Sequence, residues 1–255
     1  MLAIVEAPQV GARELRDGLS DLFARQLAKS HGDYIQYHSS KQAIASKVNS
    51  FLEYKDYLPQ DGRILDWGCH HAPDSAMIRM SSGPNQPKIT GCDFLEPDRY
   101  KIFWDFSGIE YIRLNHITRL PFEDNSFDCI VGSGALEHTA RDYESLKELY
   151  RVLKTDGHLI ITHLPNRFSY VEFAARHFRK SGFHRRLYSV SEISTLLKRS
   201  GFYPVKLRRH RILPTQSFSA VISVLSRYET TLDRIWPLNL LCGDILGVAQ
   251  KVDSM

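Results

Sequence analysis

The chain has 255 residues, of which 43% are hydrophobic and 24% are charged, so it can bury a full core without splitting into separate globular parts. Its formal net charge at pH 7 is +4, and its early apolar run, Leu2 to Val5, is too short for a signal peptide or a membrane span. Its four cysteines lack C-x-x-C spacing, which argues against a zinc site and for reduced, buried thiols in a cytoplasmic protein.

The first 60 residues predict helices. Apolar residues recur at helical spacing in two stripes, which are Leu15, Leu19, Leu22 and Phe23, and then Ile44, Val48, Phe51 and Leu52. Between the stripes lies HGDYIQYHSS, with the polar-tipped side chains of Tyr34, Tyr37 and His38. We expect both stripes to pack onto the rest of the protein.

The segment RILDWGCHHAPDS, residues 63–75, predicts a strand, a tight turn and the start of a helix. The apolar pair before Asp66 indicates a buried strand, Gly68 permits the turn, and Pro73 suits the first turn of a helix. Doubly wound folds build a nucleotide crevice in this way, but an ordinary turn of any α/β protein has the same outline. His70 and Ala72 stand where a complete G-x-G-x-G loop would carry its second and third glycines.

Four further segments predict strands that alternate with helices. They are Ile89 to Asp93, a strand beginning at Tyr111, Phe127 to Val131, and His158 to His163 after an Asp156-Gly157 turn. A helix capped by Asp142 precedes the last of these. This alternation predicts a parallel sheet with helices on both faces.

These segments together resemble the class I S-adenosylmethionine-dependent methyltransferases, in particular the group that methylates small molecules, sugars, quinones and lipids. The resemblance rests on ILDWGC, LPFEDNSFDCIV, SGALEH and LKELYRVLKTDGHLIITHLPN, and it covers residues 61–166 with a weaker continuation to Pro204. It implies an α/β fold with a doubly wound, seven-stranded, mostly parallel sheet. It also implies that residues 1–60 form a helical lid over a core of residues 61–255.

The resemblance implies S-adenosylmethionine as the cofactor and assigns residues to it. Asp66 and Gly68 would lie against the methionine portion, with His70 in the same loop, and Asp93 would bind the ribose hydroxyls. The remaining implied contacts are Phe94 beside the ribose acid, His116 and the neighbouring Ile117 at the adenine, and Ser133 on the floor of the crevice; Asn115-His116 stands where the family usually has Gly-Asp.

Two features after Pro165 bear on the identity of the acceptor, the molecule that would receive the methyl group. Residues 177–211 contain ten Lys or Arg residues and the single acid Glu192, which is either a solvated face or a positive field for an anionic acceptor or membrane surface. Residues 215–243 form an apolar insertion, in which Phe218, Ile222, Leu225 and Trp236 pack in the core, line an acceptor pocket or face lipid. No nucleic-acid-binding signature accompanies the charge.

The predicted reaction is an in-line methyl transfer, for which His138 and His163 are the candidate bases because each follows a predicted strand at the crevice. His138 is equally suited to a structural role at a helix start. Two alternatives to a methyltransferase are considered, of which the first stays open and the second is disfavoured. One is a non-catalytic binding or scaffold protein of the same fold with an eroded cofactor loop; a dinucleotide oxidoreductase is disfavoured, because it has no need of the LPFEDNSFD and RVLKTDG runs.

Overall fold

The structure is a computed structural model that describes residues 10–29, 33–97, 99–116, 118–178, 184, 186–214, 225 and 228–252. Its helices are α1 (Ala12–Lys29), α2 (Asp33–His38), α3 (Lys41–Tyr54), α4 (Pro73–Ser81), α5 (Lys101–Ser107), α6 (Asp142–Val152), α7 (Tyr170–Phe178), α8 (Val190–Arg199) and α10 (Glu229–Leu232), with 3-10 turns η1 (Lys55–Tyr57), η2 (Leu136–His138) and η4 (Leu238–Leu241). Its strands are β1 (Arg63–Trp67), β2 (Lys88–Asp93), β3 (Glu110–Arg113), β4 (Phe127–Ser133), β5 (Leu153–Pro165), β6 (Phe202–His210) and β7 (Asp244–Lys251).

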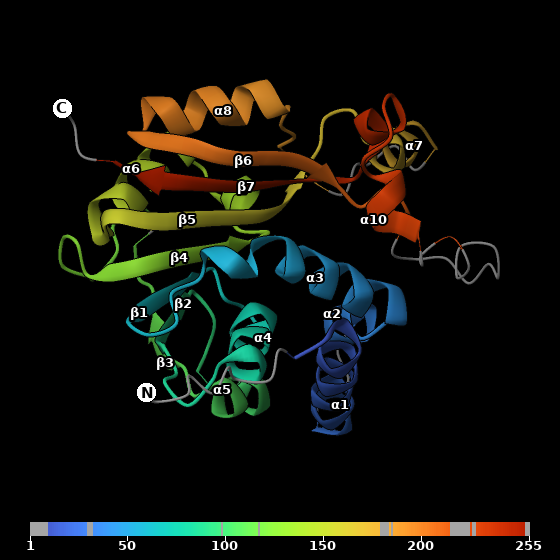
Figure 1. The fold of residues 1–255 in the computed structure, drawn as a ribbon. Helices are drawn as coiled ribbons and strands as arrows, with labels where there is room; N and C mark the ends of the chain where they lie inside the picture. The colour runs from blue at the N-terminus through green and yellow to red at the C-terminus, as the bar shows by residue number, and fades with distance from the viewer. Residues whose placement is uncertain are drawn as a thin grey trace, which may run out of the picture.

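The seven strands form one sheet in the order β3-β2-β1-β4-β5-β7-β6 (Figure 1). All neighbouring pairs are parallel except those of β7, which runs antiparallel to both β5 and β6. The prediction of a seven-stranded, mostly parallel sheet is therefore confirmed. All four cysteines are free and buried, as expected.

Helices cover the sheet on both faces. One apolar cluster joins α1, α3, α4 and α5 to the sheet, and a second joins α6 and α8 to its other face. Both predicted N-terminal stripes lie in the first cluster, where Leu15, Leu19, Val48 and Phe51 are completely buried. Among the described residues, no helix combines the length and the apolar character that crossing a bilayer requires.

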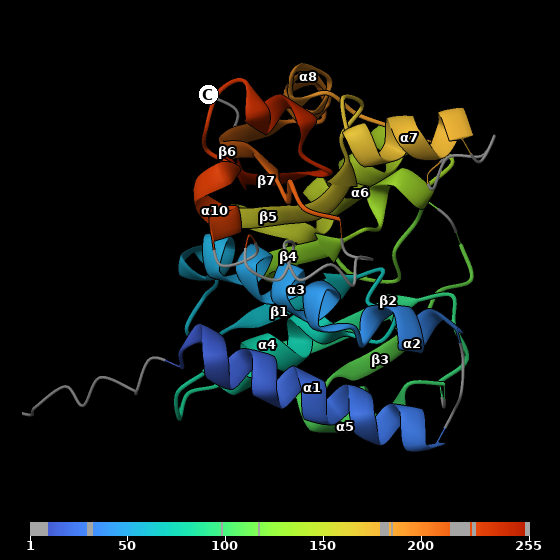
Figure 2. The ribbon, with the colours of Figure 1, turned by 90° about the vertical axis from the view of Figure 1, so that its right-hand side faces the viewer.

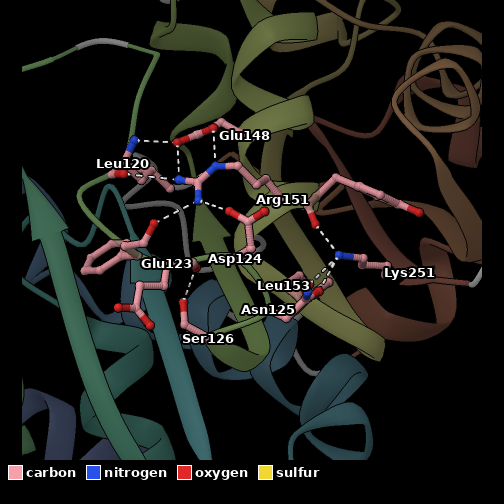
Figure 3. A network of polar contacts seen from close by, with 11 residues as sticks. Leu120, Glu123, Asp124, Asn125, Ser126, Glu148, Arg151, Leu153 and Lys251 are labelled. Carbon is pink, nitrogen blue, oxygen red and sulfur yellow. Dashed lines mark hydrogen bonds and ion pairs between the residues drawn. The ribbon is translucent and has the colours of Figure 1, made fainter.

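The two sequence runs LPFEDNSFD and RVLKTDG meet at Arg151 (Figure 3). The Arg151 guanidinium pairs with Glu148 of its own helix, Nη2 to Oε1 at 2.6 Å, and with Asp124 at 2.6 Å, and it donates to the carbonyl of Phe122 at 2.9 Å. Glu148 in turn accepts the backbone N–H of Leu120 at 2.8 Å. The pairing of these runs therefore fastens the loop before β4 to α6, which is a structural role.

Local helix signals give one correction and one confirmation. Asp142 does not cap α6: Arg141 occupies the N-cap position, and Asp142 is the first helical residue, whose carboxylate accepts the neighbouring N–H of Tyr143. Ser189 and Glu192, whose spacing in the sequence is that of a capping box, do form one at the start of α8, which confirms this local signal. An acid stabilises the start of a helix both at the N-cap and in the first turn, so the presence of Asp142 alone does not distinguish these two positions.

Four of the ten basic residues in the run 177–211 pair with acids from elsewhere in the chain. Lys206 and Arg208 pair with Glu53 of α3, Arg186 pairs with Asp142, and Arg211 pairs with Asp244. These carboxylates are distant in sequence, so the run looked far more positive in the sequence than it is in the fold. The sheet edge that these pairs help to build carries the candidate site.

Candidate functional site

The candidate site lies at the carboxyl edge of β1, β2, β4 and β5, where helices α2 and α3 pass in front of the sheet. Figure 2 views the molecule from the side of this edge. Parallel strands deliver their following loops to the same edge, which is where ligands bind in open α/β sheets. The loops that begin at Gly68, Phe94 and Gly134 all meet there.

The loop after β1 keeps a glycine-like backbone at two residues that are not glycine, His70 and Ala72. Gly68, His70 and Ala72 all have positive φ angles, of 67°, 46° and 53°. At Gly68 an added Cβ would lie 2.7 Å from the Cβ of Ala135, so no side chain fits there. His70 and Ala72 are thus held in a left-handed conformation that costs an L-residue free energy and that a functional loop retains only when its surroundings enforce it.

Asp66 is buried and faces the helix that follows the loop. Its carboxylate accepts the hydroxyl of Ser75 on α4 at 2.5 Å. Burial, with the nearby carboxylate of Asp74, raises the pKa of Asp66 to about 7. The structure therefore places Asp66 beneath the loop, where it anchors α4, and its contact with a methionine portion stays a prediction.

Asp93 ends β2 directly across from the loop. One carboxylate oxygen accepts the backbone N–H of His70 at 2.9 Å, and the other accepts the N–H of Phe94 at 2.6 Å. The phenyl ring of Phe94 is exposed. The strand-end acid and the loop thus form one unit, with a further lone pair on each carboxylate oxygen.

An aromatic cluster from the N-terminal helices covers this loop. The ring of His70 lies between those of Tyr34, at 4.2 Å, and Tyr100, at 4.8 Å, measured between ring centroids. Tyr34 also contacts His38, whose Nδ1 is 3.1 Å from the amino group of Lys47. Burial lowers the pKa of His70 to about 4 and that of His38 to about 2, so both rings are neutral at pH 7.

The end of β4 brings three residues to the crevice. Ser133 accepts the hydroxyl of Thr162 at 3.0 Å. Glu137, in η2, is only 6% exposed, its Oε2 has no partner among the described residues, and burial raises its pKa to about 8. His138, beside it, is mainly exposed, and partial burial lowers its pKa.

His163 lies near the end of β5 and is held by a buried ion pair. Its Nδ1 is 3.2 Å from Oδ2 of Asp244, the first residue of β7. Arg211 donates to both oxygens of Asp244 at 2.7 Å. Although burial opposes it, Arg211 and His163 hold the pKa of Asp244 below its usual range. Sequence motifs do not indicate Asp244 or Arg211 as site residues; the one local signal is an acid, Asp244, inside the apolar run CGDILGV.

The remaining predicted residues fall in three places. His116 is exposed on the loop after β3, while Ile117, Phe218 and Ile222 lie outside the described residues. Leu225 and Trp236 are exposed, so neither packs in the core. The structure thus brings together Gly68, His70 and Asp93, and separately Ser133 and His163.

Comparisons with known proteins agree with this geometry. Residues 65–161 match the family model described as "Methyltransferase domain". The demethylmenaquinone methyltransferase of Listeria monocytogenes serotype 4a is 37% identical over 110 residues, which cover 40% of this chain and 46% of that protein. The ubiquinone/menaquinone biosynthesis C-methyltransferase of Escherichia fergusonii is 42% identical over 54 residues, 21% of each protein. The chain therefore spans less than half the length of these curated relatives.

Solved structures share the fold across most of the chain. The 1,6-didemethyltoxoflavin-N1-methyltransferase of Burkholderia thailandensis, with bound S-adenosylhomocysteine, superposes with a TM-score of 0.58 at 18% identity, covering 98% of this chain and 94% of that one. A [4+2]-cyclase, SpnF, superposes with a TM-score of 0.59 at 16% identity, covering 94% of this chain and 96% of the cyclase. At these identities the likeness concerns the fold, which hosts more than one reaction.

Proposed function

We propose, from the premise that residues 65–161 are a methyltransferase domain, that this chain is an S-adenosylmethionine-dependent methyltransferase acting on a small or lipid-like acceptor. The observation that carries the proposal is the loop of Gly68 to Ala72 inside the matched domain. Three residues of this loop are left-handed, and one of them, His70, donates its backbone N–H to Asp93. The relatives that match this domain are named for methyl transfer to quinones, which supports an acceptor of the small-molecule class.

The residues at the crevice suit this cofactor. Gly68 leaves a bare backbone where a Cβ would be blocked, and Asp93 keeps lone pairs with which it can accept ribose hydroxyls. Glu137 contributes a buried oxygen that has no partner in the part of the chain that the structure describes. When bound, S-adenosylmethionine supplies an electrophilic methyl group. The chain's task is then to hold the acceptor close and dry, which is worth about 7–11 kcal/mol of the barrier.

Helices α1 to α3 act, in this proposal, as the lid, with the division from the core near residue 60. The stacking of Tyr34 on His70 supports this role, because it joins α2 directly to the cofactor loop. The gap between η1, which ends at Tyr57, and β1, which begins at Arg63, supports the position of the division.

A lipid-like acceptor is supported by exposed apolar side chains beyond the same edge of the sheet. Phe173 and Phe178 on α7 are 70% and 79% exposed, and Trp236 after α10 is 76% exposed. Figure 1 shows α7 and α10 at the end of the molecule to which β5 points. Exposed aromatic groups of this kind mark interaction surfaces, and we propose transient contact with a membrane.

The anionic character of the acceptor and the cytoplasmic location stay predictions. The ion pairs of Lys206, Arg208, Arg186 and Arg211 weaken the electrostatic argument, because a paired cation contributes little field at a distance. The exposed apolar groups now carry more of the argument for a lipid-like acceptor than the charge does.

A calorimetric titration with S-adenosylhomocysteine tests the proposal. We expect saturable binding by the whole chain. No binding at millimolar ligand would contradict the enzyme and favour a scaffold protein of the same fold. Binding without methyl transfer to any acceptor would instead favour a cofactor-dependent reaction of another kind, a case that the fold of the [4+2]-cyclase makes concrete.

A further inference from the structure

A second organised polar group, outside the cofactor loop, is the chain Arg211–Asp244–His163. Arg211 donates Nε–H to Oδ2 and Nη2–H to Oδ1 of Asp244, both at 2.7 Å, so the two side chains form a bidentate ion pair. The same Oδ2 lies 3.2 Å from Nδ1 of His163. Within the described residues, Nε2 of His163 has no hydrogen-bond partner.

Two members of this chain of contacts have an unusual backbone conformation. His163 and Arg211 both have left-handed φ angles, of 56° and 63°, where non-glycine residues are uncommon. At His163 the pairing of β5 with β7 shifts register between Ile161 and Leu164, which is a bulge. Bulges and left-handed residues beside a crevice serve to aim a side chain. A Cβ at Gly243 would overlap the Arg211 guanidinium, so glycine there makes room for it.

The position of His163 is that of a base for the crevice. It follows Thr162, which pairs with Ser133 at the end of β4 and donates to its hydroxyl. The charged and titratable groups around it are His38 of α2, Lys47 of α3, His210 of β6, and the pair of Asp244 and Arg211. Burial keeps the two neighbouring imidazoles neutral, and Asp244 is the one anion among these groups.

We infer that His163 is the base that removes a proton from the acceptor, and that Asp244 and Arg211 are positioning residues for it. This inference rests on the proposed function. Asp244 accepts Nδ1–H of His163 and thereby leaves the Nε2 lone pair for the acceptor; Arg211 fixes the carboxylate. As the acceptor atom bonds to the methyl carbon, the carbon–sulfur bond breaks with its electron pair going to sulfur. The acceptor proton passes to Nε2, and Asp244 balances the imidazolium charge.

The tautomer of His163 tests the positioning roles without any acceptor. We propose long-range proton–nitrogen NMR on the whole chain labelled with ¹⁵N-histidine at pH 8, with the His163→Gln spectrum identifying the His163 signals. We expect Nδ1 to be protonated and Nε2 bare in the wild type. In Asp244→Asn, the side-chain amide can donate to Nδ1, so the Nε2–H form should become the majority. A wild-type ring already protonated at Nε2 would overturn the inference, even if the variant fails to fold.

Methyl transfer to a short-chain reduced demethylmenaquinone gives the second readout. We expect His163→Gln to lower kcat by about 10²–10⁴-fold with S-adenosylhomocysteine affinity unchanged. Arg211→Lys should lower kcat less than His163→Gln does. The lysine keeps the positive charge beside Asp244 but cannot form the bidentate pair. His158→Gln is the matched control, since His158 lies on the same strand but contacts Tyr57 instead of Asp244.

The two readouts separate this inference from the proposed function. Full activity of His163→Gln would overturn the inference and leave the methyltransferase intact. Absence of S-adenosylhomocysteine binding would overturn the methyltransferase, while the tautomer would still report on the Asp244 contact. If the wild type binds the cofactor but does not methylate this probe, the tautomer result alone decides.

Discussion

The carboxylate of Asp93 accepts the backbone N–H of His70 at 2.9 Å, across the space between the ends of β1 and β2. This contact ties the predicted ribose acid to the loop that lacks its usual glycines. It also gives a physical reason why His70 keeps a left-handed backbone, because Asp93 holds its N–H from one side while Trp104 donates to its carbonyl at 3.0 Å on the other.

Replacement of Asp93 by alanine should weaken S-adenosylhomocysteine binding by roughly 1–3 kcal/mol, because it removes charge-assisted bonds to hydroxyls and frees the loop. Calorimetry measures the loss. Asp105→Ala, which removes an exposed carboxylate paired with Lys101, should leave affinity unchanged. Equal affinities for both variants would show that Asp93 does not contact the ligand.

His70→Gly and Ala72→Gly should differ in their effect on stability and cofactor affinity, although both place glycine at a left-handed position. His70→Gly loses ring contacts with Tyr34 and Tyr100 and should lower both the melting temperature and the cofactor affinity. Ala72→Gly relieves about 1 kcal/mol of backbone strain and loses a buried methyl worth about 0.8 kcal/mol, so the free energy of unfolding should hardly change. Thermal unfolding of both variants checks this, and an unchanged His70→Gly would contradict it.

Glu137→Gln should make the unliganded protein more stable at pH 8 by roughly 1–3 kcal/mol. The folded pKa of Glu137 is raised to about 8, above the ordinary value of 4.5, so the unfolded chain loses its proton first. Wild-type stability therefore declines, through this group, as pH rises from about 4.5 to 8. Denaturant unfolding of wild type and variant at pH 5 and pH 8 isolates the effect. A difference that is the same at both pH values would contradict it.

Arg151→Ala should lower the free energy of unfolding by about 1.5–3 kcal/mol and leave S-adenosylhomocysteine affinity unchanged. The guanidinium binds two carboxylates and a backbone carbonyl that fix the loop before β4, as Figure 3 shows. Denaturant unfolding and calorimetry measure the two quantities. Arg13→Ala, at an exposed ion pair with Asp17, is the control and should change neither. Lost affinity in a folded Arg151→Ala would assign the network a functional role.

Phe173→Ala combined with Trp236→Ala should reduce sedimentation with lipid vesicles, because both side chains offer exposed apolar surface near the crevice. The apolar contribution should persist at 1 M salt, where the screening length is about 3 Å, whereas attraction to anionic lipid should fade from its value at 0.1 M. Tyr203→Ala removes an exposed ring at the start of β6, and should have no effect. Equal sedimentation of all three proteins would rule out this surface.

The sequence patterns predicted the elements whose signals are local. β1, β2 and β4 are short apolar runs ended by a polar residue or a glycine, and Ser189 with Glu192 defines a helix start within four residues. The strand predicted to begin at Tyr111 is right in type, although β3 begins one residue earlier, at Glu110. Boundaries of this kind depend on the pairing partner, which a single segment does not contain.

The parts that sequence patterns missed depend on contacts between distant segments. Asp244 meets His163 across 81 positions, and Glu53 meets Arg208 across 155, so neither charge has a local explanation. The basic run looked like a positive surface because its acids come from α3, α6 and β7. The order of the strands in the sheet brings these partners together, and no single segment of the sequence contains that order.

The place of β7 in the sheet has a consequence for the newly made chain. β7 is the last strand in sequence, yet it lies between β5 and β6, so neither of these can complete its pairing before residues 244–251 have been synthesised. Until then β5 presents an open edge of Leu159, Ile160 and Ile161 to its surroundings. Before residues 244–251 have been made, the apolar edge of β5 is therefore open to non-native pairing, and it becomes protected only when β7 joins the sheet.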